Sequence, residues 1–161
     1  MITGKNYIGK DKRDASGKTF KTFNPLSNSE NKVMFSEASD KEIDEAVDLA
    51  LEAFKEYRNI SGADKSVFLN AIADEIEALG DILIETYCSE SGLAPGRAMG
   101  ERGRTLFQLR SFADLVKEGE WVEASIDTAQ PERSPVPKPD VRKMMIPLGP
   151  VVVFGASNFP L

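Results

Sequence analysis

The sequence contains no histidine and a single cysteine, Cys88. Without histidine, these residues hold no imidazole to serve as a general base, a catalytic triad member or a metal ligand. One cysteine cannot form an intramolecular disulfide, and there is no cluster of cysteines that would hold zinc. We therefore predict no metal site and a reducing, cytoplasmic environment.

Long hydrophobic runs are also lacking. The first 21 residues are polar and rich in lysine, without the apolar core that a signal peptide needs. The longest apolar run in the chain is residues 151–154, far short of a membrane span. The sequence thus indicates neither secretion nor a membrane partner.

The chain also has no excess of positively charged residues. The chain has 20 Lys and Arg against 26 Asp and Glu, a net charge of −6, and residues 36–127 carry most of the acid. Proteins that bind nucleic acid are usually basic, so we expect no nucleic-acid partner. With 41% hydrophobic and 29% charged residues, the composition is that of an ordinary globular domain.

The first 118 residues predict a hairpin followed by helices. Residues 6–8 and 19–23 are β-prone and are separated by a turn-rich segment, which predicts that they pair, with Asn24 and Pro25 ending the second strand. Ser39 and Glu42 form a capping box before a helix that extends to about residue 54. Further helices are predicted up to residue 79, from there to Gly92, and from Pro95 to about residue 116.

The pattern changes after Gly119. Residues 121–126 and 141–146 alternate like strands, and the link between them contains four prolines. Residues 151–154 read as a short buried strand of a parallel sheet. Residues 155–160 would then form the loop at its carboxyl end, where open α/β sheets usually bind ligands.

The final run, IPLGPVVVFGASNFPL at residues 146–161, resembles the first strand and the asparagine loop of the NAD(P)-dependent aldehyde dehydrogenase superfamily. The rest of the chain is collinear with the amino-terminal part of that family. Where most members have Pro-Trp before the asparagine, this chain has Ala156 and Ser157. That departure resembles the branch of ketoglutarate-semialdehyde dehydrogenases and NADP-dependent long-chain aldehyde dehydrogenases.

The resemblance implies part of an α/β fold. Residues 1–121 would form the amino-terminal part of the cofactor domain, residues 122–146 strands of an oligomerisation arm, and residues 147–161 the first parallel strand and its loop. Two strands that leave a domain through a proline-rich link also expose unpaired edges, which a second subunit usually covers. We expect a homo-oligomer, a dimer or a tetramer, and a catalytic domain outside these residues.

The resemblance also implies roles for the loop. Asn158 would be the catalytic residue that donates its side-chain amide to the oxyanion of the intermediate; without the resemblance it reads as a turn asparagine. The residues before it would approach the nicotinamide ribose of NAD or NADP, with NADP slightly favoured, although they equally fit an ordinary strand-to-loop junction. They are Phe154, Gly155, Ala156 and Ser157.

Substrate contacts are expected from Arg104, Gln108 and Phe159. The resemblance implies that the helix containing Arg104 lines the aldehyde tunnel and that Arg104 falls where other members of the family often have an apolar residue, which favours a carboxylated semialdehyde such as 2,5-dioxopentanoate. The simpler alternative is that Arg97, Arg102, Arg104 and Arg110 lie on an exposed helix face. A long-chain aldehyde, an acyl-forming semialdehyde dehydrogenase and a non-enzymatic helical interaction module remain open.

Cys88 does not fit the role of the nucleophile. A reactive cysteine needs a base, a cation or a helix amino terminus nearby, whereas its neighbours in sequence include Glu85 and Glu90. We expect a structural, half-buried thiol. The nucleophilic cysteine and the general-base glutamate implied by the resemblance would lie outside this chain, so these residues alone should be inactive.

Overall fold

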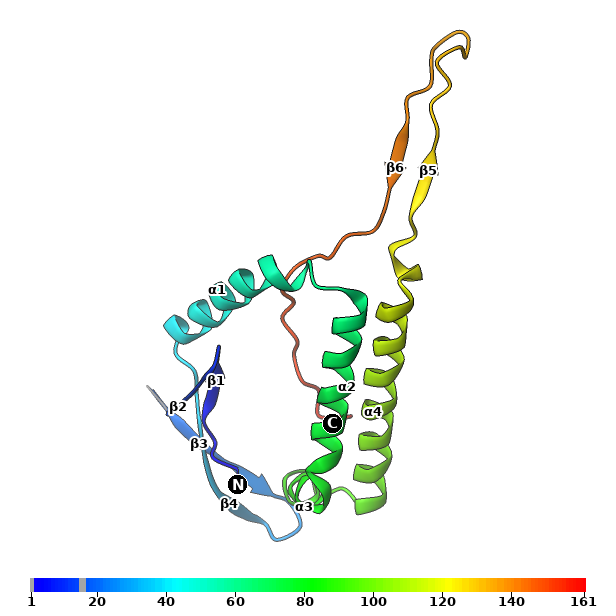
Figure 1. Ribbon diagram of the computed structural model, residues 1–161. Coiled ribbons are helices and arrows are strands. Elements are labelled where there is room, and N and C mark those ends of the chain that lie inside the picture. The colour runs from blue at the N-terminus through cyan, green and yellow to red at the C-terminus, as the bar shows by residue number, and fades with distance from the viewer. Residues whose placement is uncertain (1, 15–16) are drawn as a thin grey trace.

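The computed structural model describes residues 2–14 and 17–161 (Figure 1). The chain order begins with β1 (Asn6–Ile8), β2 (Asp11–Arg13), β3 (Thr19–Asn24) and β4 (Ser29–Ser36). The helices α1 (Asp40–Tyr57), α2 (Gly62–Ala78), α3 (Gly80–Ser91) and α4 (Pro95–Glu118) follow. The short η1 (Glu120–Val122) leads into β5 (Ser125–Asp127) and β6 (Val141–Lys143).

The four predicted helices are present, and each ends within about three residues of its predicted end. Ser39 and Glu42 form both halves of a capping box at the start of α1, with the Ser39 amide donating to the Glu42 carboxylate at 2.8 Å. Leu79 lies between α2 and α3, and Gly80, the first residue of α3, has a positive φ of 55°. Gly92 and Gly119 end α3 and α4 in the left-handed conformation that favours glycine.

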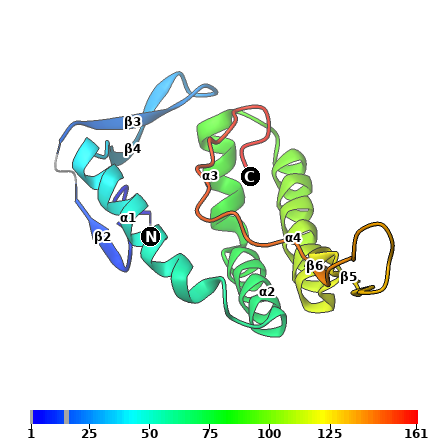
Figure 2. The same ribbon diagram turned by 90° about the horizontal axis from the view of Figure 1, so that it is seen from above.

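Helices α2 and α4 lie side by side, as both views show (Figures 1 and 2). Small residues let them approach, since Ala73 on α2 and Ala113 on α4 are completely buried. At the start of α2, Gly62 faces the main-chain carbonyl of Val116 near the end of α4, and a methyl group there would collide with that oxygen. The close approach of Gly62 to the Val116 main chain therefore sets the distance between α2 and α4 near the start of α2.

We expect Gly62→Ala to destabilise the chain by about 1–3 kcal/mol, because the added Cβ must push α2 away from α4. The matched control is Gly103→Ala, at an exposed position on α4 where an added Cβ meets nothing within 4 Å. There alanine should stabilise the helix by about 0.5–1 kcal/mol. Urea unfolding of both variants measures the difference, and equal effects would show that Gly62 is not a contact point.

The predicted pairing of residues 6–8 with residues 19–23 is wrong. β1 pairs with β2, and β3 pairs with β4, each as an antiparallel hairpin. The left-handed Gly9 allows a tight turn directly after β1, and pairing with β2 closes a much shorter loop than pairing with β3 would. β3 does end at Asn24, whose Oδ1 accepts hydrogen bonds from the amides of Leu26 and Ser27 at 2.9 and 3.2 Å.

An ion pair fastens the first hairpin to α1. The guanidinium of Arg13 in β2 donates to both carboxylate oxygens of Glu45, at 2.6 and 2.7 Å. These hydrogen bonds hold the pKa of Glu45 below its ordinary value. The two-point contact fixes the orientation of the hairpin as well as its position.

The segment after α4 forms an arm, with shorter strands than predicted. Trp121 lies in η1 instead of a strand, because left-handed conformations at Gly119 and Glu123 interrupt the extended chain on either side. β5 and β6 pair antiparallel, and an isolated bridge joins Gln130 to Lys138 beyond them. The hairpin projects away from the helices, with the proline-rich link at its tip (Figure 1).

Residues 151–154 do not form the predicted buried strand. They have no assigned strand structure, and their side chains are 70–89% exposed. A parallel strand needs a neighbouring strand to satisfy its main-chain groups, and the described residues provide none beside this segment. The segment crosses between α1 and the α2–α4 pair (Figure 1). In the described part of the chain, no helix is long and apolar enough to cross a membrane.

Candidate functional site

The asparagine loop, residues 155–161, lies between α3 and α4 (Figure 2). Polar contacts from α4 hold it there. Arg97 Nη2 donates to the main-chain oxygen of Asn158 at 2.7 Å, and Thr105 Oγ1 donates to that of Leu161 at 3.0 Å. The Leu161 amide donates to Glu101 Oε2 at 3.4 Å. These contacts join positions about 60 residues apart in sequence.

Arg97 and Glu101 also bind each other. They are four residues apart on α4, and Arg97 Nε donates to Glu101 Oε1 at 2.6 Å. The Glu101 side chain is only 2% exposed. Burial alone would raise the pKa of Glu101, but its hydrogen bonds and the Arg97 charge outweigh burial and hold that pKa below its ordinary value. Glu101 is thus a buried carboxylate kept ionised by its partner.

Tyr87 on α3 lies beside this pair. Burial, with a contribution from the Glu101 carboxylate, raises the pKa of Tyr87. Its hydroxyl is buried and has no hydrogen-bond partner among the described residues. Ordinary protonated tyrosine is therefore the form that this environment favours.

Arg104 and Phe159, two of the residues expected to contact substrate, lie together. The guanidinium carbon of Arg104 is 5.6 Å from the centre of the Phe159 ring. Gln108, one turn further along α4, is exposed, and none of the contacts within the described residues joins it to the loop. The structure therefore brings Arg104 to the loop but does not bring Gln108 there.

The other arginines of α4 bind protein groups. Arg110 donates to Asp74 and Glu77 on α2 at 3.1 and 2.8 Å, and Arg102 donates to the main-chain oxygen of Gly80 at 3.2 Å. The simpler interpretation, an exposed helix face, does not describe these two arginines, because both are half-buried and fasten α4 to its neighbours, whereas Arg97 and Arg104 are exposed. Arg97 and Arg104 instead engage the loop.

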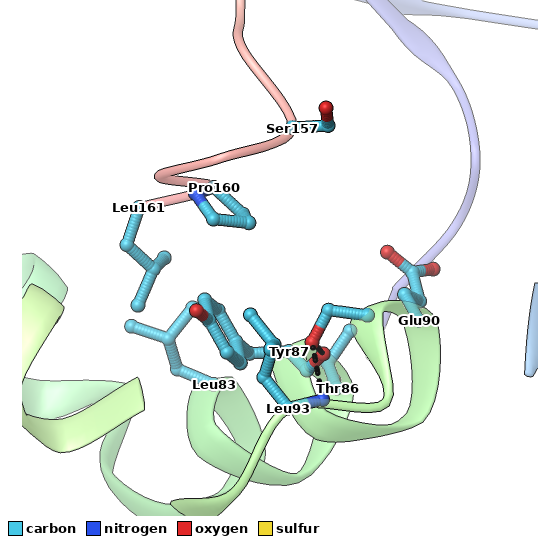
Figure 3. Close-up of a pocket in the computed structure, with 9 residues that line it drawn as sticks. Leu83, Thr86, Tyr87, Glu90, Leu93, Ser157, Pro160 and Leu161 are labelled. Atoms are coloured by element: carbon cyan, nitrogen blue, oxygen red, sulfur yellow. Dashed lines mark hydrogen bonds between the residues drawn. The ribbon is translucent and has the colours of Figure 1, made fainter. Parts of the chain in front are cut away.

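A cavity of about 560 Å³ opens where the loop meets α3 (Figure 3). Its walls include Tyr87 and Leu93 on one side and Ser157, Pro160 and Leu161 on the other. Cys88, half-buried, packs with Leu161 against the cluster formed by Ile84, Tyr87 and Ala98. The half-buried environment expected for Cys88 is confirmed.

The four residues assigned to the cofactor are all exposed. Phe154 is 89% exposed, and Gly155, Ala156 and Ser157 follow it along the surface. A Cβ added at Gly155 would meet nothing within 4 Å. The main chain here is open to a cofactor that approaches it closely, so the residues present fit that group. Within the described ranges, no group of three or more Cys, Asp and Glu side chains is placed to hold a metal ion.

Sequence reasoning did not assign Arg97, Glu101, Thr105 or Tyr87 to the candidate site. The first three recur every four residues, so they lie on one face of α4. That spacing was available as a signal, but it did not indicate what the face contacts. Only the fold shows that the face meets the asparagine loop.

Residues 12–161 match the model of the aldehyde dehydrogenase family. The chain belongs to the aldehyde dehydrogenase family. It is 47% identical to alpha-ketoglutaric semialdehyde dehydrogenase 2 of Azospirillum brasilense, with all of this chain covered and 31% of the relative. It is 42% identical to the alpha-ketoglutaric semialdehyde dehydrogenase of Acinetobacter baylyi over 98% of its length, 30% of that relative. The chain therefore spans about a third of these relatives' length.

Solved structures of the family share the fold. An NAD-dependent benzaldehyde dehydrogenase from Corynebacterium glutamicum superposes with a TM-score of 0.72 at 20% identity, over 81% of this chain and 28% of the other. A betaine aldehyde dehydrogenase from Staphylococcus aureus gives 0.72 at 16% identity, over 84% of this chain and 26% of the other. The α/β fold class predicted from the sequence is confirmed as a partial aldehyde dehydrogenase fold.

Proposed function

We propose that this chain is the amino-terminal segment of an aldehyde dehydrogenase that oxidises a carboxylated semialdehyde, 2,5-dioxopentanoate, to a carboxylic acid with NAD or NADP. The observation that carries the substrate class is the position of Arg104. The guanidinium of Arg104 lies over the ring of Phe159, the residue that follows Asn158 in sequence. No contact within the described residues pairs this guanidinium with a carboxylate. A carboxylate on the substrate would supply that partner.

Asn158 donates to the oxyanion in this proposal. The described residues show no hydrogen bond from its side chain, whereas its main-chain oxygen is fixed by Arg97. The amide is therefore free to receive a developing negative charge. When bound, NAD(P) supplies the hydride acceptor, and the exposed main chain of residues 154–157 would hold its nicotinamide end. We assign the nucleophile and the general base to residues outside this chain.

The β5–β6 arm supports the proposal of a homo-oligomer. No third described strand pairs with either one, so both outer edges are open, and Ile126 and Val141 are 67% and 49% exposed. A partner subunit is the usual cover for such an edge. We infer a dimer or a tetramer formed through this arm.

The test is the substrate preference of a full-length aldehyde dehydrogenase that carries this segment. We expect kcat/KM for 2,5-dioxopentanoate to exceed that for pentanal by at least about tenfold, the contribution of one charge-assisted contact. Measuring each aldehyde with NAD and with NADP assigns the cofactor. Equal rates on the two aldehydes, or faster oxidation of dodecanal, would overturn the carboxylated substrate and favour the long-chain alternative.

A further inference from the structure

One face of α4 fastens the asparagine loop at its middle, Asn158, and at its last residue, Leu161. Arg97 binds the main-chain oxygen of Asn158, while Glu101 and Thr105 bind the amide and the oxygen of Leu161. The anchors are three residues apart along the loop and come from successive turns of one helix. Because helices are stiff, these contacts fix the loop against a rigid support.

Arg97 binds two groups at once. Arg97 uses Nε for Glu101 and Nη2 for Asn158, so one planar guanidinium links the buried carboxylate to the loop. Glu101 in turn reaches Leu161 with its second oxygen. A guanidinium has several donors in a fixed plane, which suits it to hold two acceptors in a set orientation.

We propose that Arg97 and Glu101 are positioning residues that set the orientation of Asn158 toward the reacting oxygen. The proposal rests on the proposed function of Asn158 as an oxyanion donor. Holding the Asn158 main-chain oxygen fixes the plane of the peptide that follows its Cα and limits the directions that the side-chain amide can take. Neither residue needs to touch substrate or cofactor.

Loss of this support should appear in the chemical step. A displacement of about 1 Å in a reacting group can cost about 100-fold in rate. In the full-length enzyme we expect Arg97→Ala to lower kcat by about 10–100-fold and to leave the KM for NAD(P) within about threefold, because only a group used in the transition state has moved.

A double-mutant cycle tests whether Arg97 affects kcat through Asn158. If Arg97 acts through Asn158, Arg97→Ala should have almost no further effect on kcat in an Asn158→Ala background. Glu101→Gln provides a second variant in case Arg97→Ala folds poorly. It keeps an acceptor oxygen and loses the charge that holds Arg97, so we expect a smaller loss of kcat that also vanishes in the Asn158→Ala background.

Arg102→Ala is the matched control. Arg102 lies on the same helix and also donates to a main-chain oxygen, that of Gly80, but it does not contact the loop. It should leave kcat near that of the wild type. A structural measurement accompanies the kinetics: amide hydrogen exchange should become faster at residues 158–161 in Arg97→Ala and stay unchanged there in Arg102→Ala.

The outcomes separate the two proposals. If Asn158→Ala lowers kcat and Arg97→Ala does not, or if Arg97→Ala lowers kcat equally in both backgrounds, the positioning role is overturned and the function of Asn158 stands. If Asn158→Ala itself leaves kcat unchanged, the proposed function of Asn158 fails, and the positioning role falls with it. A kcat loss that vanishes in the Asn158→Ala background, with faster exchange confined to the loop, supports the proposal.

Discussion

Replacing Asn158 with alanine in the full-length enzyme should lower kcat by roughly 10²–10³, the cost of removing one oxyanion donor. Cofactor binding should remain nearly intact, because the amide is used mainly in the transition state. Steady-state kinetics under conditions where chemistry limits the rate, together with NAD(P) titration, measure both quantities. The structure gives the amide no competing local partner among the described residues.

Asn158→Asp should be at least as harmful, since a carboxylate would face a developing negative charge. Asn24→Ala serves as the matched control, because Asn24 is a turn asparagine whose Oδ1 accepts from two following amides. It should cost stability, roughly 0.5–1.5 kcal/mol for neutral hydrogen bonds, and leave kcat unchanged. If both Asn158 variants kept more than about a third of the wild-type rate, Asn158 would be no more than another turn residue.

The helices could be predicted because their signals are local. A capping box at Ser39, glycines at the breaks and apolar residues at helical spacing all act within a few residues. The strand pairings could not be predicted equally well. Whether residues 6–8 pair with residues 11–13 or with residues 19–23 depends on turn geometry at Gly9, and residues 151–154 depend on neighbouring strands that the described residues do not supply.

The candidate site likewise has a part that the sequence predicts and a part that only the fold reveals. Asn158 and the residues before it stand in one continuous motif, so a resemblance over 16 residues was enough to select them. Arg97 and Glu101 contact that motif across about 60 residues, and nothing in their own surroundings in sequence indicates it. The four-residue spacing shows a common face of α4, but the partner of a face is a property of the packed chain.

Arg104→Met should raise the KM for 2,5-dioxopentanoate by roughly 10–150-fold, because a hydrogen-bonded contact with a charged group contributes about 1.5–3 kcal/mol. The reason is the distribution of partners along α4. Arg97 and Arg110 bind carboxylates and Arg102 binds a carbonyl, whereas the contact found for Arg104 is with an aromatic ring. A substrate carboxylate would give the Arg104 guanidinium an anionic hydrogen-bond partner.

The size and selectivity of the effect distinguish substrate binding from support of the loop. The contact of Arg104 with the Phe159 ring at an exposed site contributes about 0.5–1 kcal/mol, so losing it alone should cost no more than about fivefold, and equally for every aldehyde. Substrate binding instead predicts a large loss with 2,5-dioxopentanoate and an unchanged or lower KM for pentanal, with Arg102→Met affecting neither aldehyde. Equal, small increases in KM for both aldehydes would mean that Arg104 supports the loop and does not bind the substrate carboxylate. The long-chain aldehyde alternative would then be favoured.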